Sequence, residues 1–169
     1  MKKLLILPLL CGVLYTDKAD LRGGCDHTRE YEGKPYINRL IWHESKGKTR
    51  AYSRKGAIGY MQIMPKDGAL DDYNTFNTNG DKFTAKDLWN KEINKKIGFW
   101  YYERLGRYYE GDKVKQVSAY NMGFGNTDSG AINFDYVFRI MGTNKVLTWL
   151  DGRKVKPWKG TTSVYYVLE

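Results

Sequence analysis

Hydrophobic residues upstream of position 44 recur at intervals of three and four, the spacing of one face of an α-helix. Ile37, Leu40 and Ile41 occupy this face, and Glu44 continues it one turn later. We therefore expect the Glu44 carboxyl to point inward. Loss of hydration there would raise its pKa, as a general acid requires. The alternative is a surface glutamate beside a helix end, for which Gly47 is a suitable stop.

A glycine-rich segment follows this helix. Gly56 and Gly59 bracket a short apolar stretch, which indicates a tight turn or a close approach of the backbone. From Tyr60 to Met64 the residues alternate in polarity, as in a short strand or an extended loop. Gln62 and Met64 would then share a face.

Two longer helical patterns follow. One begins at Thr84 or Asp87, and we interpret its apolar stripe as core. Asp112 is a suitable N-cap for the next helix, whose apolar face ends at Asn121. A buried Asn there would need partners, either the backbone of a turn or a ligand. The apolar stripe of the first of these two helices consists of Ile93, Ile97, Trp100, Tyr101, Leu105 and Tyr108. Residues 124–159 show a short helical pattern at 136–141 and no assignable chemistry.

The length of 169 residues suffices for one domain with a sizeable core. Residues 1–16 have a charged start and an apolar run, which we interpret as a leader or anchor. The run is shorter than the roughly 20 residues that span a membrane, and any membrane contact would involve this segment only. Residues 17–33 are polar and aperiodic, typical of a linker, and residues 34–169 form the expected domain.

The chain has few cysteines and histidines, the residues that usually bind zinc. Cys11 and Cys25 are the only cysteines, and His27 and His43 are the only histidines. Without a C-x-x-C pair or a motif around the histidines, neither a zinc set nor a cysteine nucleophile is indicated. We expect neither metal nor cofactor.

Three motifs occur in a fixed order. The first is E-S at 44–45 with S-R-K-G-A-I-G-Y-M-Q-I-M-P at 53–65, the second is E-I-N-K-K-I-G-F-W-Y at 92–101, and the third is A-Y-N-M-G at 119–123. Together they resemble the lytic transglycosylase domain of the soluble type, whose members cleave peptidoglycan glycan strands. Three motifs in one order are more specific than any one alone.

The resemblance implies an all-α, lysozyme-like single domain with a small β or irregular excursion near residues 57–63. It implies Glu44 as the catalytic acid. The last residues, T-T-S-V-Y-Y-V-L-E, look like a degraded E-T-R-x-Y-V motif of the family, in which Tyr166, or alternatively Tyr165, would hold Glu44. The implied substrate-binding residues are Ser53, Gln62, Met64, Tyr120 and Asn121, and the implied supporting residues are Ser45 and Tyr166.

The implied reaction cleaves the bond between N-acetylmuramic acid and N-acetylglucosamine and forms a 1,6-anhydro product. Ordinary glycosidases use two carboxylates about 5 to 9.5 Å apart, and no motif marks a second one here. The sequence leaves Asp67, Asp71 and Asp72 open for that role. The alternatives are therefore a hydrolysing muramidase of the goose-lysozyme kind and a non-catalytic wall-binding protein.

The net charge of +9, from 28 Lys and Arg against 19 Asp and Glu, favours a polyanionic partner such as the cell wall. A generally solvated basic surface is the alternative. The basic residues are spread over the chain without a nucleic-acid-binding motif, so we expect no nucleic-acid partner. The expected location is periplasmic or exported, where the protein would open the wall locally for a secretion or conjugation apparatus. Its alternative is a component of a phage particle.

Overall fold

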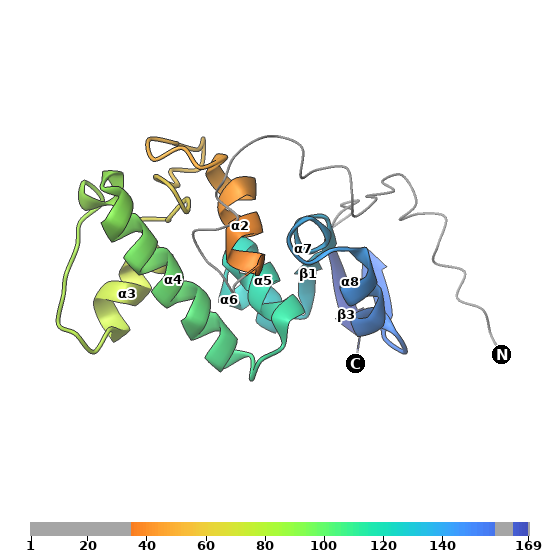
Figure 1. Ribbon diagram of the computed structural model, residues 1–169. Helices are drawn as coiled ribbons and strands as arrows, with labels where there is room; N and C mark the ends of the chain where they lie inside the picture. Colours follow the sequence, from red (N-terminus) through yellow and green to blue (C-terminus); the bar gives the residue numbers. More distant parts are fainter. Residues whose placement is uncertain (1–34, 158–163, 169) are drawn as a thin grey trace.

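The computed structural model describes residues 35–157 and 164–168. The leader expected at 1–16 and the linker expected at 17–33, with both cysteines and His27, lie outside these residues. The described chain is mainly helical, with a small sheet at one end (Figure 1). None of its helices combines the length and the apolar character that crossing a membrane would need.

Local sequence signals account for several helix boundaries. The Asn90 side chain accepts hydrogen bonds from the N–H groups of Glu92 and Ile93, and Asp112 does the same for Val114 and Lys115. The long helix therefore begins after Asn90, later than the expected start at residue 84 or 87. The helical elements are α2 (Pro35–Ser45), α3 (Ala69–Phe76), η2 (Asp87–Trp89), α4 (Lys91–Tyr108), α5 (Lys113–Met122), α6 (Phe124–Asp128), α7 (Phe134–Met141) and α8 (Thr143–Leu150).

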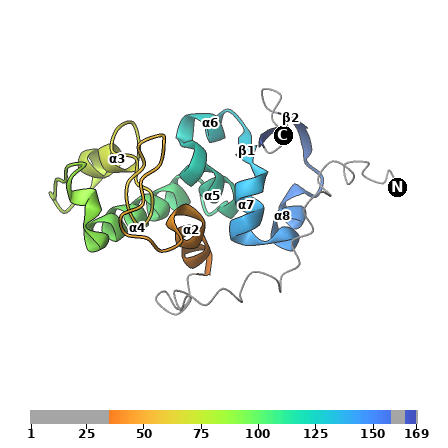
Figure 2. The same cartoon turned by 90° about the horizontal axis from the view of Figure 1, so that it is seen from above.

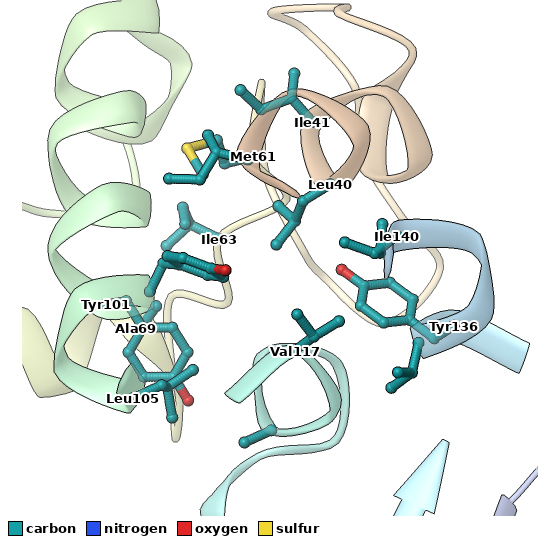
Figure 3. Packing of buried hydrophobic residues seen from close by; sticks show 14 of the residues in the cluster. Leu40, Ile41, Met61, Ile63, Ala69, Tyr101, Leu105, Val117, Tyr136 and Ile140 are labelled. Carbon is teal, nitrogen blue, oxygen red and sulfur yellow. The ribbon is translucent and has the colours of Figure 1, made fainter. Parts of the chain in front are cut away.

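The helices pack around one core. In both views α2 lies between α4 and α7, and α5 crosses behind it (Figures 1 and 2). Figure 3 shows how side chains from these four helices meet the loop that carries Met61 and Ile63. The expected stripe on α4 is only partly core, because Ile97, Tyr101 and Leu105 are buried whereas Tyr108 is 55% exposed.

A three-stranded antiparallel sheet covers the far end of this bundle. Its strands are β1 (Ala131–Asn133), β2 (Lys154–Pro157) and β3 (Val164–Leu168), in the order β1-β3-β2. The sequence patterns did not indicate this sheet, although they did indicate the excursion near 57–63. There the backbone forms isolated antiparallel bridges, Tyr52 with Ile58 and Ile58 with Ile63.

Candidate active site

Glu44 lies in the last turn of α2, next to the loop of residues 46–65. Helix α2 forms where expected and buries Ile37, Leu40 and Ile41, each at most 1% exposed. Glu44 follows them at the edge of this stripe and is half-buried. Its Oε1 accepts a 2.5 Å hydrogen bond from the hydroxyl of Tyr136. The helix thus holds one carboxyl at the boundary between core and solvent.

Burial changes the acidity of this carboxyl. Loss of hydration raises the pKa of Glu44 to about 7, and the hydrogen bond from Tyr136 offsets part of that rise. At neutral pH the protonated and ionised forms are therefore both populated. A group with such a pKa can donate a proton and take one back near neutrality, as general acid–base catalysis requires.

Tyr136 is the main site residue that the sequence patterns did not reveal. It lies in α7, which Asn133 caps by accepting from the Tyr136 N–H, and its ring extends toward α2 in Figure 3. Burial and the neighbouring Glu44 charge raise the pKa of Tyr136 well above its usual value, so its hydroxyl remains a donor. His43 packs edge-on against the same ring at 4.9 Å.

The family resemblance implied that Tyr166 holds Glu44. Tyr166 lies in β3, and its backbone pairs with Ala131 and Lys156, but its side chain lies outside the described residues. The alternative, Tyr165, is buried against Phe134 with ring centroids 5.9 Å apart. The described phenol that contacts Glu44 is Tyr136. The only earlier signal for it was the short helical pattern at 136–141.

The glycine-rich segment is a tight hairpin turn rather than a strand. Ile58 and Ile63 exchange two backbone hydrogen bonds of 2.9 Å, and the four residues between them turn back on themselves. Ser53 sits on the outer arm, where its hydroxyl accepts from the Ala57 N–H at 2.9 Å. Met64 follows the hairpin and is half-buried.

Gln62 has an unusual backbone conformation. Its φ of 51° lies in the left-handed region, which costs an ordinary residue about 1–2 kcal/mol. Its side-chain amide donates to the carbonyls of Gly59 at 2.9 Å and Ala51 at 3.2 Å, and these bonds hold the turn. The Gln62 side-chain carbonyl has no hydrogen-bond partner within the described part of the chain and remains available to a ligand.

Asn94 anchors the hairpin from α4. This fully buried amide accepts from the Met61 N–H at 2.8 Å and donates to the carbonyls of Ile58 and Leu88, each at 2.9 Å. Gly59 must pass close by: its φ is 80°, and an added Cβ would lie 2.3 Å from the Asn94 amide nitrogen. Asn94 belongs to the second motif, which was the available signal for this role.

The third motif lies partly against the same hairpin. The Tyr120 hydroxyl donates to the Met61 carbonyl at 3.0 Å, and its ring packs on Tyr101. Asn121, in contrast, is exposed and accepts from the Asn133 side chain at 2.8 Å. The expectation of a buried Asn121 was wrong: α5 ends one residue later, and Asn121 lies on the exposed side of its last turn.

Ser45 supports the junction between α2 and the loop. Its hydroxyl donates to the Tyr60 carbonyl at 2.6 Å and accepts from the Gly47 N–H at 3.1 Å. These bonds join the end of α2 to the loop. The supporting role of Ser45 and the catalytic and sugar-binding roles of the other residues remain predictions.

A cavity of about 400 Å³ lies beside the end of the third motif. Its lining includes Tyr101, Gly123, Asp67 and Asp72. Asp72 pairs with the Arg104 guanidinium at 3.2 Å, and Asp71 accepts from the Asp67 N–H at 2.7 Å. Within the described residues, no three His, Cys, Asp or Glu side chains gather as metal ligands would.

Several solved structures are similar to this chain. Two similar solved structures are a complex of the 70-kDa soluble lytic transglycosylase with bulgecin A (21% identity, TM-score 0.53) and the 70-kDa soluble lytic transglycosylase Slt70 from Escherichia coli (22%, 0.49). Each alignment covers 73% of this chain and 21% of the other. A third, an inactive mutant of lytic transglycosylase Slt from Pseudomonas aeruginosa, is 23% identical with a TM-score of 0.49, covering 69% of this chain and 19% of the other.

This chain therefore spans about a fifth of the length of those proteins. The likeness to the bulgecin complex shows a shared mainly α, lysozyme-like fold, as sequence analysis expected. No curated protein matches the chain. The sequence profile described as "Transglycosylase SLT domain" matches residues 27–133, more than half of the chain. The chain belongs to the transglycosylase SLT domain family.

Proposed function

We propose that this protein is a peptidoglycan lytic transglycosylase, with Glu44 as its catalytic acid and base. The observation that carries the proposal is the half-buried Glu44 carboxyl, whose pKa burial raises to about 7 while Tyr136 holds one oxygen at 2.5 Å. The next residue, Ser45, is hydrogen-bonded to Tyr60 of the loop that bears Ser53 and Gln62. Family membership supports peptidoglycan glycan strands as the substrate.

In the proposed reaction, one carboxyl serves in both steps. Protonated Glu44 donates its proton to the oxygen of the leaving N-acetylglucosamine as the bond from muramic acid C1 breaks. The N-acetyl carbonyl of muramic acid assists by attacking C1. The Glu44 carboxylate then takes the proton of the C6 hydroxyl, whose oxygen displaces the N-acetyl oxygen from C1 and closes the 1,6-anhydro ring, so that the N-acetyl group is restored. Water is not consumed, and the enzyme returns to its protonated form.

The loop residues would position the sugars. Ser53 would orient the N-acetyl group, and Gln62 would bind through its free carbonyl. Met64 would shape the wall of the groove. Tyr120 and Asn121 would bind the neighbouring sugar, which the exposure of Asn121 supports.

Two observations support a mechanism with one acid. The shift in the pKa of Glu44 is accounted for by burial and by Tyr136, with no contribution from another described carboxylate. Of the three aspartates considered as a second carboxylate, Asp72 already pairs with Arg104, and Asp71 accepts a hydrogen bond from the Asp67 N–H. A hydrolase would need a second carboxylate placed to activate water.

Product analysis tests this proposal. Purified peptidoglycan would be digested with the full chain and the products measured by mass spectrometry. We expect muramic acid ends in the 1,6-anhydro form. Reducing ends, one water heavier, would replace the lyase assignment with that of a muramidase. Absence of any cleavage, with binding intact, would leave a wall-binding protein.

We further propose that the enzyme acts in the periplasm or after export, where it opens the wall locally for a phage particle or a secretion or conjugation apparatus. The apolar run at 4–15 and the net charge of +9 support this setting. Intact-mass analysis of the native protein tests it. A chain that starts after the apolar run would indicate export by the general pathway, whereas a mass that includes Met1 would indicate delivery within a particle or retention as an anchor.

A further inference from the structure

The first part of the loop of residues 46–65, which follows Glu44, is strongly basic. Between Glu44 and Asp67 the chain contains no acidic residue. In the same stretch six cations are exposed, five of them at 46–55 together with Tyr52, whose ring stacks on Trp89. We call this surface the basic-aromatic strip; it consists of Lys46, Lys48, Arg50, Arg54, Lys55, Tyr52 and Trp89.

The two rings form a preorganised platform. Tyr52 is 66% exposed and Trp89 is 41% exposed, although both are large enough to stabilise a core. Their ring centroids are 6.1 Å apart and their planes 29° apart, so the rings stack. Stacking leaves the outer face of Tyr52 open while restricting its motion. Exposed, ordered ring faces of this kind suit the apolar faces of sugar rings.

The cations beside the rings are available to a ligand. Among the described residues, Lys48, Arg50, Arg54 and Lys55 have no ion-pair partner. Like charges gathered on one loop repel one another, and a bound anion would relieve that repulsion. The strip therefore favours a ligand that combines ring surfaces with negative charge.

The strip is joined to the hairpin of the candidate active site by hydrogen bonds. Tyr52 precedes Ser53 and bridges to Ile58, and the Gln62 amide donates to the carbonyl of Ala51. The platform is therefore bonded directly to the hairpin that follows α2.

We propose that the basic-aromatic strip binds a stretch of the peptidoglycan strand outside the bond being cleaved. Tyr52 and Trp89 stack on a sugar, and the cations pair with carboxylates of the stem peptides. This inference rests on the proposed function, since the ligand is the same polymer. A basic surface with rings also fits single-stranded nucleic acid, but the continuity with the glycan site favours the wall.

The test measures binding without cleavage. Purified, insoluble peptidoglycan would be titrated with the full chain carrying Glu44→Gln, alone or with Tyr52→Ala and Trp89→Ala. We expect the added pair to weaken binding about tenfold, or about 1.4 kcal/mol. Tyr52→Phe keeps the ring and should bind as before. Leu147→Ala is the matched control, because Leu147 is 44% exposed on α8, away from the loop (Figures 1 and 2).

The charges are tested in the same assay. Lys48→Gln with Arg50→Gln should weaken binding, and the loss should shrink at high salt as screening removes the charge term. The proposal would be overturned if Tyr52→Ala with Trp89→Ala bound peptidoglycan as tightly as the Glu44→Gln parent. It would also be overturned if Leu147→Ala weakened binding as much as the two ring substitutions do. A loss of binding to single-stranded DNA but not to peptidoglycan would assign the strip to nucleic acid instead. Product analysis of the wild type judges the proposed function separately.

Discussion

Replacing Glu44 by Gln should change stability in a pH-dependent way. A carboxyl whose pKa rises from 4.5 to about 7 on folding binds its proton more tightly in the folded protein. The contribution of Glu44 to the free energy of unfolding therefore falls as pH rises from about 4.5 to about 7, and it stays constant above that pH. The shift corresponds to a loss of about 3 kcal/mol at alkaline pH. Glu44→Gln keeps the shape and an acceptor for Tyr136 but carries no charge, so it avoids this loss.

Thermal unfolding at two pH values measures the effect. At pH 4.5 Glu44→Gln and the wild type should unfold at similar temperatures. At pH 8.5 the variant should be more stable by up to about 3 kcal/mol, which for a chain of this size is up to about 10 °C. The control is Glu110→Gln, because Glu110 is exposed and its replacement should give no pH-dependent gain. A difference between Glu44→Gln and the wild type that is the same at both pH values would refute the argument.

The same variant tests the chemistry. A general acid contributes about 10² to 10⁴ in rate, so Glu44→Gln should lose at least about 99% of the glycan-cleaving activity while still binding peptidoglycan. Wall-clearing assays at matched protein concentration measure this. If the variant keeps more than a small fraction of the activity, Glu44 is not the acid.

Three further changes probe the surroundings of Glu44. Tyr136→Phe removes the hydrogen bond that lowers the pKa of Glu44, so the alkaline limb of the pH–rate profile should move to higher pH. The free energy of urea unfolding should fall by about 1 kcal/mol. An alkaline limb at the same pH as in the wild type would contradict this. Asn94→Ala leaves three buried backbone groups without their hydrogen-bond partner, so the free energy of urea unfolding should fall by about 2–4 kcal/mol. A loss below about 1 kcal/mol would argue against the anchoring role of Asn94. Asn121→Ala should change stability by less than about 0.5 kcal/mol, since the side chain is exposed, yet weaken peptidoglycan binding in the Glu44→Gln background. Undiminished binding would remove Asn121 from the groove.

The sequence by itself determined the local features of this protein. The apolar spacing of Ile37, Leu40 and Ile41 predicted α2 and the position of Glu44 at its end, because helix periodicity depends on neighbours in the chain. Asp112 predicted the start of α5 for the same reason, since a cap bonds only to the next turn. The three motifs indicated the family that the sequence profile then matched.

Only the tertiary structure decided which groups surround the acid. Tyr136 lies 92 residues from Glu44, and their contact depends on how α7 packs against α2, which no local pattern encodes. The same holds for Asn94, whose partners lie up to 36 residues away, and for the pairing of β1 with β3. Asn121 shows the converse error, because a periodic face is buried only where another element covers it. Spacing along the chain fixes which face a residue is on, and packing fixes what that face meets.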